Sequence, residues 1–182
     1  AQLTVLAGPT AVGKGTVVAA LTKRYPTLNV SVSATTRDPR PGELNGVHYY
    51  FVSAQEFDAM IERGDMLEWA LVHGKNKYGT PRGPVDEALA AGKPVLLEID
   101  LAGARQVRTN RPDAQFIFLA PPSWEELQRR LIGRGTEGPA EQARRLATAR
   151  VEREAASEFD HVVINDDVER AVDELARLIG LE

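Results

Sequence analysis

The sequence contains no cysteine, and this absence excludes disulfide bonds, thiolate metal sites and a cysteine nucleophile. No apolar run is long enough to cross a bilayer, and we predict neither a signal peptide nor attachment to a membrane. Only three histidines occur, His48, His73 and His161, and none has the spacing of a metal site or a serine partner. We predict structural roles for them, and the composition favours a protein of the reducing cytoplasm.

The chain also has no excess of positive charge, because its formal net charge is −4 at pH 7. Nonspecific binding to nucleic acid needs a basic surface and is therefore not expected. The basic residues are divided unequally, into 17 arginines and 5 lysines. Arginine contacts phosphate with two parallel hydrogen bonds, so the bias fits phosphate chemistry, and it fits the codon usage of a GC-rich genome equally well. A length of 182 residues indicates one domain with a substantial core.

A glycine-rich segment, AGPTAVGKGT at residues 7–16, organises the chain. It follows an apolar run at 3–6 that predicts a buried strand, and it precedes a segment at 17–24 that predicts a helix. This order is the context of a phosphate-binding loop, in which backbone N–H groups and a helix N-terminus face a phosphate chain. Lys14 adds a full positive charge to that site. A glycine turn with an unrelated lysine is the alternative interpretation.

Beyond residue 82 the chain alternates between apolar runs and helical segments, which predicts a parallel sheet flanked by helices. Strands are expected at 95–100, 115–119 and 162–164, with helices at 83–91, after 123, at 141–158 and through 181. Asp100 ends the most apolar of these strands, at the position where parallel sheets present ligands. We interpret the polar cluster at 108–111 as a solvated face.

Residues 30–80 interrupt this alternation, which predicts a small mixed lobe inserted after the first helix. We expect strands at 30–33, 47–52 and 66–72, a proline-stiffened loop at 34–43, a helix at 53–64 and a polar turn at 75–80. Ser53 and Ser123 each precede a glutamate by three residues, so we expect both to cap helices. A polar segment at 134–142, flanked by arginines, predicts a mobile lid.

Taken together, these motifs resemble the guanylate kinase family over essentially the whole chain. The segments that carry the resemblance are GPTAVGKGT at 8–16, SVSATTRDPRPGE at 31–43, NGVHYYFV at 45–52, LEWA at 67–70, LEIDLAGA at 97–104, FLAPPS at 118–123, GRGTE at 133–137 and INDD at 164–167. The resemblance implies an Mg²⁺-dependent cytoplasmic kinase that transfers the γ-phosphoryl group of ATP to GMP, and to dGMP, giving ADP and the diphosphate. It also implies an α/β phosphate-loop kinase fold and no obligatory protein partner.

The resemblance further divides the chain and assigns roles to its residues. It implies a core at 1–33, 82–133 and 147–182, a GMP-binding lobe at 34–81, and a helical arginine lid at 134–146. ATP binding is implied for Gly8, Pro9, Thr10, Ala11, Val12, Gly13, Lys14, Gly15, Thr16 and Asn165. GMP binding is implied for Ser33, Arg37, Arg40, Tyr49, Glu68, Tyr78, Gly79, Thr80 and Asp100. Catalytic roles are implied for Lys14, Arg134 and Arg145.

The chemistry of guanine supports the role implied for Glu68. The guanine edge presents N1–H and N2–H₂ donors, which suit a carboxylate acceptor, whereas adenine presents a bare N1 acceptor there. The resemblance places Ser33 beside Glu68 at the base, and Arg37, Arg40 and Tyr49 at the GMP phosphate. A solvated acid on an edge strand is the alternative interpretation of Glu68.

Two residues depart from the family pattern. Gly15 replaces the usual Ser or Thr, whose hydroxyl contacts Mg²⁺, and Ala143 replaces an aliphatic residue of the lid. Gly-Lys-Gly-Thr also resembles adenylate kinases, so the first departure affects metal geometry more than activity. We expect no direct protein ligand to Mg²⁺, with Asp100 contacting it only through water.

Two other classes of function stay open. One is a non-catalytic guanylate-kinase-like module that binds phosphopeptides or partner proteins, and the other is a ribosyl bisphosphate phosphokinase. Lys14 and the lid arginines weigh against the first, and Ser33 with Glu68 weighs against the second.

Overall fold

The computed structural model describes residues 1–9, 11–132 and 138–181. A five-stranded sheet with the order β2-β7-β1-β8-β9 forms its centre, and every pair of neighbouring strands in it is parallel. Its strands are β1 (Leu3–Ala7), β2 (Asn29–Val30), β7 (Val95–Glu98), β8 (Gln115–Ala120) and β9 (His161–Ile164). The predicted α/β fold with a parallel-sheet core is therefore confirmed.

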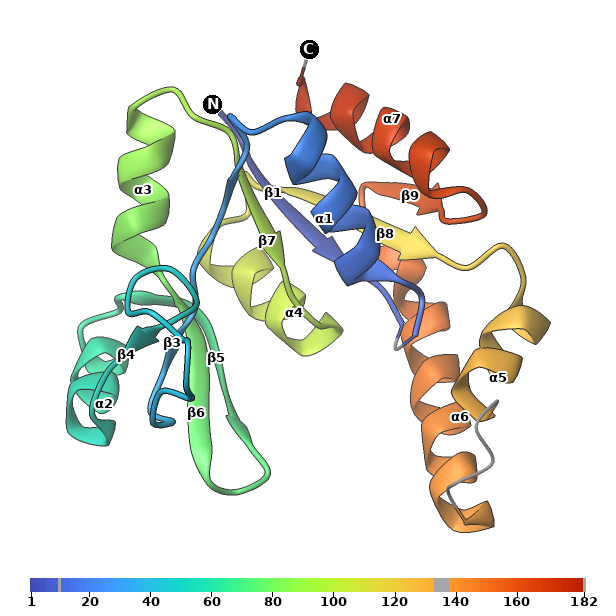
Figure 1. Cartoon of the computed structure of the whole chain (residues 1–182), viewed down its shortest axis with the longest axis horizontal. Coiled ribbons are helices and arrows are strands. Elements are labelled where there is room, and N and C mark those ends of the chain that lie inside the picture. The colour runs from blue at the N-terminus through green and yellow to red at the C-terminus, as the bar shows by residue number, and fades with distance from the viewer. Residues whose placement is uncertain (10, 133–137, 182) are drawn as a thin grey trace.

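Helices cover both faces of this sheet (Figure 1). On one face α1 (Lys14–Arg24) and α7 (Val168–Ile179) bury an aliphatic core with Leu6, Ile117 and Val163. On the other face α3 (Arg82–Ala90) and α4 (Leu101–Asn110) pack with the odd-numbered residues of β1 and with Phe116. The two cores follow from the period of two along each strand, which sends successive side chains to opposite faces.

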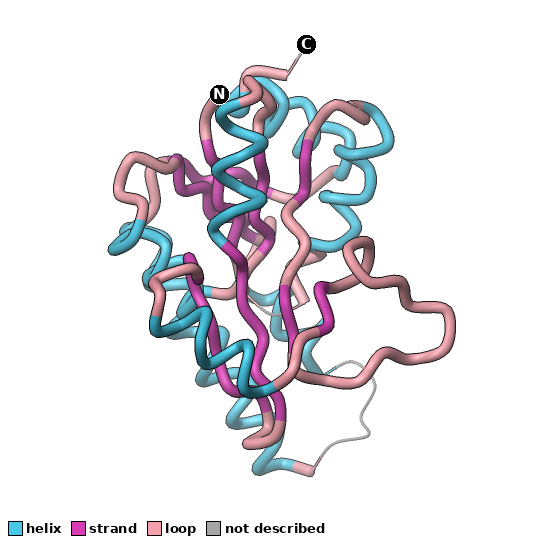
Figure 2. The backbone as a smooth tube through the Cα atoms, turned by 90° about the vertical axis from the view of Figure 1, so that its left-hand side faces the viewer, coloured by secondary structure: helices cyan, strands magenta, loops and turns pink. Residues whose placement is uncertain are grey.

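A smaller sheet with the order β4-β3-β6-β5 projects from the core as a lobe. Its strands are β3 (Ala34–Thr35), β4 (Tyr50–Phe51), β5 (Met66–Val72) and β6 (Asn76–Pro81), and α2 (Ala54–Glu62) packs on it through Phe57. The connection from β3 to β4 runs as a long loop away from the body of the molecule (Figure 2). The lobe is mixed, because β3 pairs with β4 in parallel and with β6 antiparallel.

A second projection consists of α5 (Trp124–Ile132) and α6 (Pro139–Glu154), followed by the 3₁₀ turn η1 (Ala155–Glu158). The two helices share a small core of Leu127, Leu131 and Ala149. Figure 1 shows the lobe and this helix pair on opposite sides of the segment that joins β1 to α1. The division into core, lobe and lid at the stated residues stays a prediction. No helix of the described residues is long and apolar enough to span a membrane.

Several local predictions are wrong, and in each case pairing partners from elsewhere in the chain decide the outcome. The expected turn at 75–80 is strand β6, which pairs with β5 in a hairpin. The expected strand at 30–33 ends at Val30, and Ala34–Thr35 pairs as β3 inside the expected loop. Of the expected strand at 47–52 only 50–51 forms a strand, with an isolated bridge from Tyr49 to Asn45. The described end of the expected lid, from Pro139, is the first turn of α6, and the mobility of the lid stays a prediction.

The expected solvated face at 108–111 is correct only in part, because Thr109 and Asn110 are exposed while Arg108 and Arg111 are half-buried. The Arg108 guanidinium lies 4.4 Å from the centre of the Phe116 ring, and Asn110 donates a hydrogen bond to the β5 backbone. Arg111 forms an ion pair with Asp86 of α3. By contrast, both predicted helix caps are confirmed, because the hydroxyls of Ser53 and Ser123 accept backbone N–H bonds at 3.0 and 3.1 Å.

Candidate active site

The loop between β1 and α1 turns tightly just before the helix begins. Ala11 and Gly13 have positive φ angles of 69° and 94°. Gly8 lies so close to β8 that an added Cβ would come within 2.5 Å of the Leu119 carbonyl oxygen, so only glycine fits there. The loop is therefore shaped by its own glycines and by the neighbouring strand. Thr10, also predicted for this loop, lies outside the described residues.

Asn165 supports the same loop from the end of β9. Its side chain is buried, and its Nδ2 donates to the Val12 carbonyl at 2.8 Å. An added Cβ at Gly13 would lie 2.9 Å from that nitrogen, so the loop and the amide are closely fitted. The ATP-binding role implied for Asn165 stays a prediction.

Lys14 is the first residue of α1, and its ammonium group points back across the loop. Its Nζ donates to the carbonyls of Ile99 at 3.3 Å and Gly8 at 3.5 Å. Burial lowers the pKa of Lys14, and nearby carboxylates oppose this change. Those carboxylates belong to Glu98, Glu152 and Asp100. The lysine thus occupies the point where the loop, the end of β7, α4 and α6 meet.

Two of these acids, Glu98 and Glu152, were missed by the sequence reasoning. A signal for Glu98 was available, because it stands two residues before Asp100 in the most apolar of the expected strands. In the structure it ends β7, and an added Cβ at Gly15 would lie 3.8 Å from its Oε1. No comparable signal marked Glu152, since it is one of many charges on α6. Only the packing of α6 brings it near the loop.

A cleft of about 220 Å³ lies between the lobe and α4. It is lined by Ser33, Glu68, Trp69, Ala70, Val72, Tyr78, Glu98, Ile99, Asp100, Gly103 and Gln106. Four of the residues predicted to bind GMP, at positions 33, 68, 78 and 100, therefore meet in one place although they are far apart in the sequence.

Glu68 is the acid of this cleft whose pKa is clearly raised. Burial raises the pKa of Glu68 to about 7, and the charge of Asp100 adds to the rise, while hydrogen bonding from Thr80 acts against it. Thr80 lies directly opposite Glu68 in the β5–β6 pair, and Gly79 pairs with Trp69. An added Cβ at Gly79 would lie 2.7 Å from the Glu68 carbonyl oxygen, so the strands approach closely behind the acid.

Asp100 caps α4, and its Oδ1 accepts the backbone N–H of Gly103 at 2.7 Å. This bond holds the carboxylate at the helix N-terminus, where the partial positive charge of the helix favours an anion. Glu68 and Asp100 are thereby presented side by side from two different elements. Carboxylate oxygens are hydrogen-bond acceptors, so two carboxyl groups held side by side suit the recognition of a ligand edge that carries hydrogen-bond donors.

Arg37 is held in the β3–β4 loop by a carboxylate that the sequence reasoning did not select. Its two terminal nitrogens donate to the two oxygens of Glu43 at 2.9 and 3.0 Å. This bidentate pair lowers the pKa of Glu43 to about 2, because ionised Glu43 is hydrogen-bonded to the guanidinium. Glu43 also accepts the backbone N–H of Arg40 at 2.7 Å. Its position three residues after Arg40 in a proline-stiffened loop was the signal that could have identified it.

The aromatic residues predicted for the GMP phosphate surround Arg37. The guanidinium lies 5.2 Å from the centre of the Tyr49 ring, and that ring meets Tyr78 edge-on at 5.9 Å. Arg37, Tyr49 and Tyr78 therefore lie next to one another, as expected of residues that are predicted to contact the same phosphate. Arg40 lies in the same loop with an exposed side chain.

Of the two predicted lid arginines, Arg134 lies outside the described residues. Arg145 is on α6, where its Nε lies 3.5 Å from Oε1 of Glu141. It lines a cavity of about 190 Å³ with Glu141, Arg144 and Thr148. The lid role of both arginines stays a prediction.

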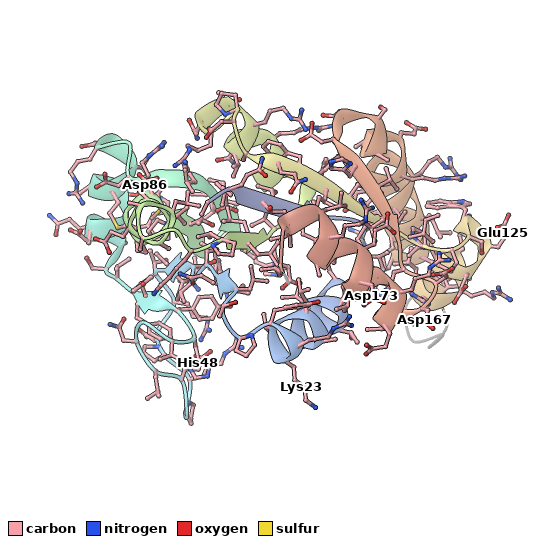
Figure 3. All side chains as sticks on the ribbon, turned by 90° about the horizontal axis from the view of Figure 1, so that it is seen from above. Lys23, His48, Asp86, Glu125, Asp167 and Asp173 are labelled. Carbon is pink, nitrogen blue, oxygen red and sulfur yellow. The ribbon has the colours of Figure 1, made fainter. Side chains whose placement is uncertain are left out.

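The histidines do not gather at this site. Figure 3 shows His48 at the outer edge of the lobe, where its Nδ1 accepts the Leu44 N–H at 2.9 Å and orders its own loop. Across residues 1–9, 11–132 and 138–181, no group of three or more His, Cys, Asp or Glu side chains could hold a metal ion.

Known proteins match the chain along its whole length. The family model described as guanylate kinase matches residues 1–182. The chain is 61% identical over 178 residues to a guanylate kinase of Leifsonia xyli subsp. xyli, covering 98% of this chain and 70% of that protein. It is 60% identical over 179 residues to a guanylate kinase of Thermobifida fusca, covering 98% and 91%.

The same result comes from solved structures. The crystal structure of a guanylate kinase from Anaplasma phagocytophilum superposes with a TM-score of 0.73 at 33% sequence identity, covering 98% of this chain and 84% of that one. A model match over every residue and relatives of about 60% identity over nearly the full length are decisive for the family. The chain belongs to the guanylate kinase family.

Proposed function

We propose that this chain transfers the γ-phosphoryl group of ATP to GMP, giving ADP and GDP. One observation carries the proposal: the carboxylates of Glu68 and Asp100 share a cleft, and Asp100 also acts on Lys14 of the phosphate loop. A site for a guanine edge and a site for a phosphate chain are therefore continuous. In a kinase for a nucleoside monophosphate, acceptor and donor must meet at such a junction.

Guanine recognition falls to Glu68 in this proposal. Its ionised carboxylate accepts N1–H and N2–H₂ of guanine, with Ser33 and Asp100 at the same base. Adenine would place an N1 lone pair against the buried carboxylate and leave both groups without a partner. A second group of residues would bind the GMP phosphate, namely Arg37, Arg40, Tyr49, Tyr78 and Thr80.

The reaction needs charge neutralisation more than proton transfer. A GMP phosphate oxygen attacks the γ-phosphorus, and the bond from that phosphorus to the β–γ bridging oxygen breaks as ADP leaves. The attacking phosphate is already close to doubly negative at neutral pH, so no general base is required. Lys14, with Arg145 and Arg134 as lid residues, would stabilise the charge that develops on the transferred group.

Magnesium fits this site as an ion held mainly by ATP. Position 15 offers no hydroxyl, and the described acids near the loop do not converge on one point as a metal cluster. Mg²⁺ readily keeps several waters and binds phosphate oxygens, and when bound it neutralises part of the phosphate charge. Glu98 and Asp100 would then hydrogen-bond its water ligands rather than ligate it.

The deciding experiment is a coupled ADP-release assay with ATP and a panel of acceptors. GMP, dGMP, AMP, CMP, UMP and a ribosyl bisphosphate are compared with a reaction that contains ATP alone. ADP release is expected with GMP and dGMP, at rates far above the ATP-only background. Binding of GMP without turnover would favour the non-catalytic module, and turnover of the ribosyl bisphosphate alone would favour the phosphokinase. Either result would overturn the proposal.

A further inference from the structure

Strand β5, which carries Glu68, is the outer strand of the lobe sheet, and α4 lies against its free edge. The backbone N–H and C=O groups on such an edge have no strand partner and need another one when they are covered. In an antiparallel pair, successive residues of an outer strand turn their backbone groups alternately to the partner strand and to the free edge. Leu67 and Trp69, which flank Glu68, have backbone groups on the free edge, where they bond to α4.

Side chains of α4 bond to the Leu67 carbonyl and to both backbone groups of Trp69, on either side of Glu68. The Gln106 amide donates from Nε2 to the Trp69 carbonyl at 2.9 Å, and its Oε1 accepts the Trp69 N–H at 3.0 Å. The Asn110 amide donates from Nδ2 to the Leu67 carbonyl at 2.8 Å. One glutamine thus makes both bonds that a neighbouring β-strand would make to Trp69. The register of β5 against β6 shifts between Met66 and Glu68, so this is also where the strand most needs a second support.

A glycine on the same face of α4 leaves the space that the Glu68 carboxylate occupies. Gly103, Gln106 and Asn110 are spaced three and four residues apart, which aligns them along one side of a helix. A Cβ added to Gly103 would lie 2.8 Å from Glu68 Oε1 and 3.1 Å from Asp100 Oδ1. The first of these atoms is the end of a flexible side chain, which can move away at little cost to the fold. A methyl group at 103 would therefore displace the carboxylate rather than unfold the helix.

We infer that α4 is the positioning element of the guanine site: Gly103 leaves the space in which the Glu68 carboxylate meets Asp100, while Gln106 and Asn110 fix the β5 backbone on either side of it. This inference rests on the proposed function, because it names the residues that hold the guanine-reading carboxylate of that same site. The three residues act through Glu68 and have no direct role in phosphoryl transfer.

Gly103→Ala tests the inference, with Gly83→Ala as its control. Gly83 lies in α3, and an added Cβ there meets nothing within 4 Å. The acceptors are GMP and IMP, because hypoxanthine has the N1–H of guanine but lacks the 2-amino group. We expect Gly103→Ala to lower kcat/KM for GMP about 10- to 100-fold, as for loss of a hydrogen bond to a charged group, and to lower it less for IMP. The KM for ATP and the Tm should match those of Gly83→Ala.

Gln106 and Asn110 are tested through the strand that they hold. Gln106→Met keeps the side-chain length and removes both bonds to Trp69, and Gln55→Met makes the same change at an exposed position of α2. We expect amide hydrogen exchange at Trp69 to accelerate about tenfold or more, together with a higher KM for GMP and an unchanged KM for ATP. Asn110→Ala should have the same effects to a smaller degree, since it removes one bond.

The outcomes separate the inference from the proposed function. A GMP-to-IMP ratio in Gly103→Ala equal to that of the unaltered chain would overturn the inference while leaving the proposed function intact. Equal losses for GMP, IMP and ATP together with a lower Tm would also overturn it, because they would show a merely structural role. Absence of GMP phosphorylation by the unaltered chain would overturn the proposed function itself, and the inference with it.

Discussion

In the phosphate loop, the groups that face ATP in our proposal are backbone N–H groups, whereas in the lobe the groups that face GMP are charged side chains. The loop is fixed by the contact of Gly8 with β8 and by the bond from Asn165 to Val12. The lobe instead depends on the Arg37–Glu43 pair and on a Glu68 carboxyl with a raised pKa. The binding of ATP should therefore be insensitive to most side-chain changes in the loop and to ordinary changes of pH. The binding of GMP should be sensitive to both.

The largest effect is expected where the loop does rely on a side chain. Lys14→Met should reduce turnover about 10³-fold, because a fixed cation facing the transferred phosphoryl group is lost. The fold should persist, since the hydrogen bonds of Lys14 Nζ to described residues are two long ones to carbonyls, at 3.3 and 3.5 Å. ADP release and thermal denaturation measure the two effects. Lys23→Met is the control, because Lys23 points into solvent from α1 (Figure 3). Near-normal turnover of Lys14→Met would refute the phosphate-loop assignment.

Glu68→Gln should produce the next largest effect, confined to the GMP side. Replacing the carboxylate by an amide removes a charge-assisted hydrogen bond, so kcat/KM for GMP should fall by about 2–3 kcal/mol of transition-state binding. The KM for ATP should not change. Glu62→Gln, at an exposed position of α2, provides the matched control. If the kcat/KM for GMP stayed the same, Glu68 would not be the residue that reads the base.

Arg40→Ala and Tyr49→Phe should weaken GMP binding without slowing the chemical step. Each removes one contact with a phosphate that does not change its bonding to ribose, so KM for GMP should rise about 5- to 20-fold with kcat within about threefold. Steady-state kinetics with varied GMP at saturating ATP measure both constants. Arg177→Ala on α7 controls for loss of an exposed arginine. A fall in kcat with unchanged KM would place these residues at the transferred phosphoryl group instead.

The pH dependence of KM should also differ between GMP and ATP. Only ionised Glu68 accepts both guanine donors, and its pKa is about 7, so KM for GMP should rise about tenfold from pH 8 to pH 6. Glu68→Gln should abolish this dependence and leave only the titration of GMP itself. The KM for ATP, measured over the same range, should change much less.

The same pKa has a consequence for stability. Because the folded pKa of Glu68 is about 7 and the unfolded value is about 4.3, the folded state binds more protons between these values. The contribution of Glu68 to the free energy of unfolding therefore decreases as pH rises through this window. Glu68→Gln should raise that free energy by about 3–4 kcal/mol at pH 8 and leave it unchanged at pH 4. Equal stability at pH 8 would mean that the carboxyl is not desolvated.

The smallest expected effect concerns Gly15. An added Cβ there has Glu98 Oε1 at 3.8 Å as its nearest neighbour, so serine fits without displacing the loop. Its hydroxyl would supply a ligand that Mg²⁺ otherwise takes from water, so the Mg²⁺ concentration for half-maximal rate should fall a few-fold, on the order of threefold. The KM for GMP should not change. Identical Mg²⁺ titrations of the two proteins would show that the missing hydroxyl has no influence.

Much of the core could be predicted from the sequence, and less of the lobe. In the core, the strands β1, β8 and β9 and the cap at Ser123 lie where local patterns indicate them, and in the lobe only β5 and the cap at Ser53 do so as closely. The hairpin strand β6 was mistaken for a turn, because 76–81 has no apolar alternation of its own and is stabilised by pairing with β5. The residues predicted to bind GMP were selected through a family resemblance, which did not point to Glu43, Glu98 or Glu152.

The sequence by itself determined the phosphate loop, since glycines at 8 and 13, a preceding apolar run and a following helix all act within a few residues of one another. The tertiary structure decided what surrounds that loop and the cleft that contains Glu68. Glu152 approaches Lys14 only because α6 packs there, and Gln106 meets Trp69 across 37 residues of chain. Such contacts depend on the pairing and packing of whole elements, which no short window of sequence encodes.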